Sequence, residues 1–197
     1  MRRILSGVAV GLVAFCVVGG EALAFSVSYD QTVFQRGTVS ASKVVIKDQM
    51  FRIEFTGGAG SEESVIIRNE DGIFQYLPAE GQAVRLSSLE KVQQPLEALD
   101  DYAAYLDEHQ AELIGAEIVN GITCDVYRFT DSDGAGLTTA WVWRGKQFPV
   151  RVELGEGEER TVVELTHIRL DVKPHESMFQ LPDHIQIIDV DGGFALE

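Results

Sequence analysis

Residues 50–55 read MFRIEF, a stretch that decides the class of fold. Apolar side chains alternate there with Arg52 and Glu54. Successive side chains of a β-strand point to opposite faces of the sheet, so this alternation separates an apolar face from a charged face. The stretch therefore predicts a strand of an antiparallel sheet that has one buried face and one solvated face.

Similar short segments, separated by Gly, Asp and Asn turns, flank this strand on both sides. The expected strands cover residues 25–29, 38–47, 64–69, 73–77, 118–119, 123–130, 139–144, 150–154, 161–170 and, more weakly, 185–190. The pair Asn120-Gly121 is a strong signal for a two-residue hairpin turn. About nine or ten strands at this spacing predict a mainly β (α+β) protein whose antiparallel sheet forms a barrel, a half-barrel or a sandwich.

One stretch, about residues 87–114, breaks the period of two and predicts a helical lid inserted in mid-chain. Pro95 interrupts it, which indicates a kink or two short helices. We expect the second helix to run from a cap at residues 100–101 to Leu113, with Gly115 as its C-terminal cap. The apolar side chains that this lid would turn toward the sheet are Leu89, Val92, Leu96, Leu99 and Leu106.

The first 24 residues have the pattern of a signal peptide. Two arginines precede a nearly continuous apolar run at residues 4–20, and Ala22-Leu23-Ala24 has the small–x–small pattern of a cleavage site. We expect a mature chain that begins at Phe25, forms one domain over residues 25–197, and is periplasmic or secreted. The minor alternative is that residues 4–20 are retained as a membrane anchor.

Charge and cysteine content restrict the partners and the stabilising chemistry. The chain has 31 acidic and 16 basic residues, for a formal net charge of −15, which excludes sequence-independent binding to nucleic acid. After cleavage Cys124 is the remaining cysteine, so no internal disulfide can form. Its place in an apolar alternation predicts a buried, unreactive thiol.

No catalytic or metal-binding motif stands out. The four histidines are far apart, and H-E-x-x-H, G-x-S-x-G and a phosphate-binding glycine loop are all missing from the sequence. Glu54, Glu153 and Glu164 lie on polar strand faces near arginines, which predicts ion pairs rather than paired acid and base groups. We expect no enzyme, no metal and no cofactor; a hydrolase would need scattered acidic groups or histidines to converge in a cleft.

Apolar and aromatic side chains are the most informative feature. We expect the following to share one face of the sheet: Phe51, Ile53, Phe55, Phe74, Tyr76, Trp141, Trp143, Val152, Leu154, Val163 and Leu165. They either form an ordinary core beneath the helices or line a cavity for an acyl chain. The lid is short for so wide a sheet, and two tryptophans are bulky for a core, so the cavity interpretation stays open.

A series of short motifs runs through the mature chain: Phe25-Ser26, residues 47–54, Ile67-Arg68, Asp71-Gly72, Tyr76-Leu77-Pro78, residues 121–127, Trp141-Val142-Trp143, residues 148–151 and residues 179–182. Their order and spacing resemble the periplasmic lipoprotein carrier and sorting superfamily (LolA/LolB-like), and within it the small DUF4412-type relatives. The resemblance implies an unclosed, strongly curved antiparallel sheet wrapped partly around helices, with a hydrophobic cavity that shields acyl chains.

These observations together predict an exported envelope protein with no catalytic role. It would bind a lipid, an acyl chain or a lipidated protein in a hydrophobic cavity, and inner- or outer-membrane envelope components are its expected partners. The alternative is an envelope interaction or sensor module whose core is fully packed. The oligomeric state and the identity of the ligand are not predicted.

Overall fold

The computed structural model describes residues 25–56, 64–86, 99–130 and 136–189. Its strands are β1 (Ser26–Gln35), β2 (Thr38–Lys47), β3 (Met50–Phe55), β4 (Val65–Asn69), β5 (Gly72–Leu77), β6 (Gln82–Leu86), β7 (Glu112–Val119), β8 (Ile122–Thr130), β9 (Leu137–Trp143), β10 (Phe148–Leu154), β11 (Thr161–Leu170) and β12 (Gln186–Asp189). The helical elements are α1 (Tyr102–Glu108) and two 3-10 turns, η1 (Gly157–Glu159) and η2 (Glu176–Phe179).

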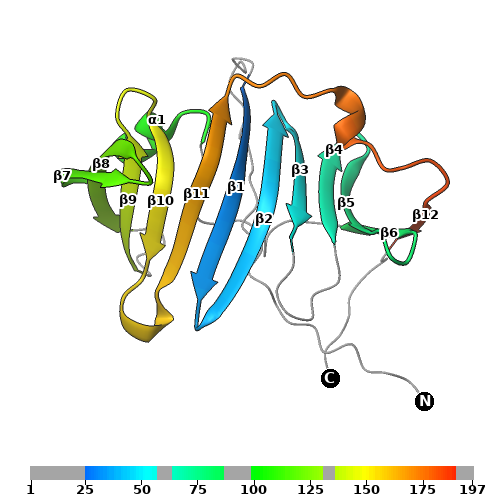
Figure 1. Cartoon of the computed structure of the whole chain (residues 1–197), viewed down its shortest axis with the longest axis horizontal. Coiled ribbons are helices and arrows are strands. Elements are labelled where there is room, and N and C mark those ends of the chain that lie inside the picture. Colours follow the sequence, from blue (N-terminus) through cyan, green and yellow to red (C-terminus); the bar gives the residue numbers. More distant parts are fainter. Residues whose placement is uncertain (1–24, 57–63, 87–98, 131–135, 190–197) are drawn as a thin grey trace.

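All twelve strands belong to one curved sheet, in the order β12-β6-β5-β4-β3-β2-β1-β11-β10-β9-β8-β7 (Figure 1). The edge strands β12 and β7 lie at opposite ends of this order, so the sheet does not close into a barrel. Neighbours are antiparallel except for β12, which pairs with β6 in parallel. The structure confirms the mainly β, antiparallel half-barrel.

Two meanders build the sheet, because β1 to β6 follow one another by hairpins and β7 to β11 do the same. The first strand of one meander, β1, pairs with the last strand of the other, β11, with Val33 opposite Val163. A register shift interrupts this pairing between Ser28 and Asp30. Strands β2, β3 and β11 have the predicted bounds, whereas β1 is twice as long as expected and β6 was not predicted at all.

The predicted hairpin turn at residues 120–121 is confirmed. Asn120 has a φ of 51° and Gly121 a φ of 81°, and Val119 pairs with Ile122 directly across the turn. Positive φ at both central residues is the type I′ geometry, whose twist matches that of the flanking strands. The turn at Arg36 and Gly37 has the same geometry but carries a weaker sequence signal.

Replacing Gly121 by alanine should therefore lower the free energy of unfolding by about 1–2 kcal/mol, because an added Cβ is strained at positive φ. Gly115 is the matched control: its φ is not positive and a Cβ built there meets nothing within 4 Å. Alanine at residue 115 should be neutral or slightly stabilising. Urea unfolding of the two variants measures the difference, and equal effects would contradict this account.

The helix of the predicted lid is shorter than expected. Helix α1 begins after Asp101, whose carboxylate accepts a hydrogen bond from the Ala104 amide at 3.0 Å, and it ends at His109. The prediction that it continues to Leu113 is wrong, because residues 112–119 pair with β8 instead. Gly115 consequently lies inside a strand and caps no helix. Cross-strand pairing overrides the helical spacing of residues that include β-branched isoleucines.

Several sequence predictions lie outside the described residues. These are the signal peptide and its alternative as an anchor, residues 1–24, and the first half of the lid with Leu89, Val92 and Leu96. Within the described ranges, no helix combines the length and the apolar character that crossing a bilayer requires.

Candidate functional site

The larger of two buried clusters defines what we call the inner face of the sheet; the opposite side is the outer face. Cross-strand rows run through this cluster, such as Phe51–Ile46–Val27 across β3, β2 and β1. A second row joins β1, β11, β10 and β9 and consists of Val33, Val163, Val152 and Ala140. The inner face is therefore apolar from β3 across to β9.

The inner face carries seven of the predicted cavity residues: Phe51, Ile53, Phe55, Val152, Leu154, Val163 and Leu165. Phe55 and Leu154 are only partly buried, whereas the other five are buried. In these strands the apolar residues alternate with polar ones such as Arg52. Because successive side chains point to opposite faces of the sheet, the sequence pattern places the apolar residues on one face. The structure brings all seven together, and their role as ligand contacts remains a prediction.

Trp141 and Trp143 do not join them; placing these tryptophans on the inner face was wrong. Trp141 lies opposite Arg151, whose guanidinium carbon is 4.9 Å from the centroid of the Trp141 ring. The Nε1 of Trp141 donates a hydrogen bond to Glu117 Oε2 at 2.8 Å. Both rings belong to the smaller, outer-face cluster. The side chains that β9 turns inward are the smaller Ala140 and Val142.

Phe74 and Tyr76 also lie on the outer face, against the prediction. The register pairs Phe51 with Arg68 and Arg68 with Ile73, so it is Ile73 and not Phe74 that shares the face of Phe51. Phe74 is nevertheless buried, with the Arg85 guanidinium carbon 4.8 Å from its ring centroid. The outer face is buried here because η2 contacts β3 and β4 and buries Phe179 completely.

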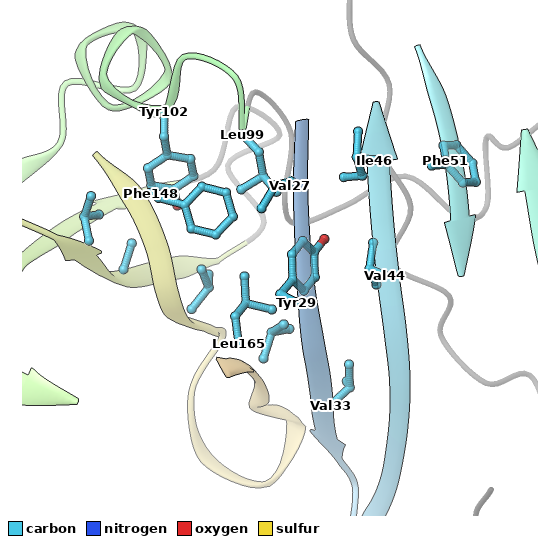
Figure 2. Close-up of a cluster of buried hydrophobic side chains, with 14 of the residues drawn as sticks. Val27, Tyr29, Val33, Val44, Ile46, Phe51, Leu99, Tyr102, Phe148 and Leu165 are labelled. Atoms are coloured by element: carbon cyan, nitrogen blue, oxygen red, sulfur yellow. The ribbon is translucent and has the colours of Figure 1, made fainter. Parts of the chain in front are cut away.

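The described part of the lid covers one region of the inner face. Leu99, Tyr102 and Leu106 are buried within the inner-face cluster. Figure 2 shows Leu99 and Tyr102 beside Val27 and Phe148, whereas Ile46 and Phe51 lie farther along the sheet. Residues around helix α1 add stacked aromatic contacts, with the rings of Tyr102 and Tyr105 5.4 Å apart, measured between centroids. The cover therefore rests on a small number of side chains.

Two unpartnered polar atoms are buried among the apolar side chains. The Tyr102 hydroxyl and the Gln31 Oε1 have no hydrogen-bond partner within the described part of the chain, although the exposed fractions of these residues are only 1% and 5%. Burial also raises the pKa of the Tyr102 hydroxyl, so this group stays protonated and remains a donor. A buried polar atom without a partner costs about 1–3 kcal/mol, so these two groups make the packed arrangement of the inner face less stable.

Two surface hollows lie away from the predicted cavity residues. One, of about 330 Å³, lies over β11, β1 and β2 and is lined by Asp30, Lys43 and His167 among others. The other, of about 220 Å³, adjoins the β1–β2 turn and includes Phe34 and Val39. Neither is lined by a predicted cavity residue.

The carboxylates considered for acid–base chemistry form ion pairs. The Oε1 atom of Glu54 lies 2.6 Å from Nε of Arg52. The Oε1 atom of Glu164 lies 3.5 Å from Nη1 of Arg151, which also forms an ion pair with Glu153. Arg151 and Glu164 are cross-strand neighbours, whereas the other two pairs join residues two apart on the polar face of one strand, so charge pairing on a partly exposed surface explains all three carboxylates. Among the described residues, no three His, Cys, Asp or Glu side chains come close enough together to hold a metal ion.

Cys124 is completely buried in the outer-face cluster, which confirms the predicted burial. Burial raises the pKa of its thiol, and the nearby carboxylates of Asp125 and Glu117 act in the same direction. A thiol that is both buried and protonated reacts slowly. We expect no reaction with a disulfide reagent such as DTNB in the native protein and complete reaction in guanidinium chloride; rapid labelling of the native protein would contradict this.

No family model and no curated protein matches this chain. Among solved structures, it is similar to an uncharacterized conserved protein from Thermus thermophilus, with 13% identity over 84% of this chain and 90% of that chain and a TM-score of 0.58. It is also similar to a chain of the Pseudomonas aeruginosa MucA/MucB complex, with 15% identity over 83% of this chain and 58% of that chain and a TM-score of 0.54.

A LolA superfamily protein from Nitrosomonas europaea aligns with 14% identity over 80% of this chain and 90% of that chain, at a TM-score of 0.37. The resemblance to the LolA superfamily and the DUF4412-type assignment both stay predictions. At these identities the similarity concerns the fold alone. The first two neighbours described, whose TM-scores exceed 0.5, support the architecture described above.

Proposed function

We propose that this chain is an exported binding protein, with no catalytic role, that takes up a lipid, an acyl chain or a lipidated segment against the inner face of its sheet. The observation that carries the proposal is the continuous apolar surface of an unclosed sheet, covered in its described part by the buried Leu99, Tyr102 and Leu106 of the lid region, with Tyr105 and Ala111 packed partly against it. The motif order that resembles lipoprotein carriers supports the same conclusion.

The free energy of burying hydrocarbon favours replacement of the lid side chains on the inner face by an acyl chain. Each CH₂ group that is buried stabilises a complex by about 0.8 kcal/mol, so half of a 16-carbon chain contributes roughly 6 kcal/mol before binding costs. The buried Leu99, Tyr102 and Leu106 would leave the inner face of the sheet as the acyl chain of the ligand binds there. The orphaned Gln31 Oε1 would then receive a donor from the ligand or from water.

Lipid extraction from the purified protein, followed by mass spectrometry, tests this proposal. We expect co-purified lipid or, from delipidated protein, saturable uptake of a fatty acid or a lipopeptide. Delipidated protein that binds none of these probes would refute it. Intrinsic tryptophan fluorescence is a poor reporter for this titration, because Trp141 and Trp143 lie on the outer face.

The second candidate is a protein-binding module whose core stays packed. One observation favours it: the inner-face cluster is filled by the chain's own side chains, including Leu99 and Tyr102. The similar chain of Pseudomonas aeruginosa comes from a protein complex, MucA/MucB, and shares this architecture. Failure of every lipid probe, together with capture of a defined envelope protein, would favour this candidate.

A further inference from the structure

Strand β7 ends the sheet with a row of exposed apolar side chains. The exposed fractions are 57% for Leu113, 42% for Ile114 and 75% for Ile118. Its hydrogen-bonded neighbour in the described sheet is β8, and it forms the left end of the molecule in Figure 1. An exposed edge strand with aliphatic side chains is a template for the addition of another strand.

The register identifies the backbone groups that this edge offers. Val119 and Ile122 close a two-residue hairpin turn, so they exchange hydrogen bonds, and the alternation of an antiparallel ladder gives Glu117 the same role. The intervening residues Ala116 and Ile118 therefore direct their N–H and C=O groups away from β8. No other strand of the described sheet pairs with these groups, so they can accept an incoming strand.

The strand is held in a conformation that is ready for pairing. At its C-terminal end the type I′ turn at Asn120 and Gly121 fixes the register. In its centre Glu117 accepts the hydrogen bond from Trp141 at 2.8 Å, which ties β7 to β9 beyond its direct neighbour. A preformed edge costs little ordering on the protein side when a segment binds.

Charge indicates which occupant fits. The segment from residue 100 to residue 119 contains no Lys or Arg, and its six acidic residues are Asp100, Asp101, Asp107, Glu108, Glu112 and Glu117. Glu112 is exposed at the start of β7, opposite Arg128 of β8, and Glu117 lies in the centre of the strand. A second copy of this chain would bring the same acidic strand and a formal net charge of −15, so electrostatic repulsion disfavours self-pairing.

We propose that β7 binds an extended segment of a partner protein in which aliphatic residues alternate with Lys or Arg. Backbone pairing with Ala116 and Ile118 would supply the affinity, and contacts with Ile114, Ile118 and the acidic side chains would supply the selectivity. This inference concerns the edge of the sheet and not the buried inner-face cluster, although the register places Ile118 on the same side of the sheet as that cluster. It does not depend on whether the protein binds lipid.

The test uses a labelled peptide, about nine residues long, of alternating valine and lysine, with fluorescence anisotropy and amide hydrogen exchange as readouts. We expect saturable binding and slower exchange at Ala116 and Ile118. Ala116→Pro removes a donor at the free edge without breaking a bond to β8, a position at which sheets tolerate proline. It should weaken binding at least about tenfold, whereas Ala116→Val, which keeps the N–H group, should bind like the parent protein.

A separate experiment tests whether the acidic side chains contribute to peptide binding. Glu112→Gln, which removes an exposed negative charge from β7, should weaken binding of the lysine peptide several-fold at low salt, and a valine–glutamate peptide should not bind. The proposal would be overturned if the lysine peptide does not bind, or if it binds Ala116→Pro as tightly as the parent protein. Binding of the glutamate peptide as tight as that of the lysine peptide would also overturn it. A dimer detected by light scattering and abolished by Ala116→Pro would also overturn it, because a second copy would then be the occupant.

Discussion

Replacing Phe148 by alanine is expected to lower the free energy of unfolding by about 3–5 kcal/mol. The ring is 2% exposed and belongs to the inner-face cluster, where it lies 6.2 Å from the ring of Tyr29, measured between centroids (Figure 2). Alanine would leave a cavity between β10, β1 and the lid, and the surrounding strands cannot collapse into it without breaking their register. Urea unfolding followed by circular dichroism measures the loss.

The control is the same substitution at Phe34, which is 40% exposed near the end of β1. Because much of that ring is in water already, Phe34→Ala should cost about 1 kcal/mol or less. Similar losses for the two variants would show that the inner-face cluster does not dominate stability. A loss confined to Phe148 would show that the inner-face cluster contributes strongly to stability.

The strands could be predicted wherever polar and apolar residues alternate strictly. Strand β3 is the clearest case, because Arg52 and Glu54 force the apolar residues between them onto one face. Turn chemistry located the β7–β8 hairpin for a similar reason, since Asn and Gly tolerate the positive φ of a type I′ turn. In both cases the physical constraint is local, so the information lies within a few residues.

Face assignment failed where both sides of a strand are buried. In β5 the adjacent Ile73 and Phe74 are both apolar, and a segment about a hundred residues away, η2, determines that the outer face is covered. In β9 a similar ambiguity concerns Trp141 and Val142, which belong to different clusters. Such choices depend on pairing partners that are distant in sequence, so periodicity alone cannot make them.

The corrected faces lead to the prediction with the largest functional effect. Phe55 and Tyr76 were both expected to line the cavity, and both are partly exposed, but Phe55 belongs to the inner face and Tyr76 to the outer face. Phe55→Lys would place an ammonium group beside bound hydrocarbon, where an unpaired charge is costly. It should reduce co-purified lipid or lipopeptide uptake at least about tenfold, whereas Tyr76→Lys should leave uptake unchanged.

Because both substitutions replace a partly exposed aromatic residue by lysine, thermal melting serves as the common check that each variant is folded. Lipid is quantified by mass spectrometry per mole of folded protein. Equal losses in the two variants would mean that uptake does not distinguish the faces, and a loss in Tyr76→Lys alone would move the ligand to the outer face. Either result would reject the inner face as the binding surface, while a loss restricted to Phe55→Lys ties hydrocarbon binding to the side of the sheet that the lid covers.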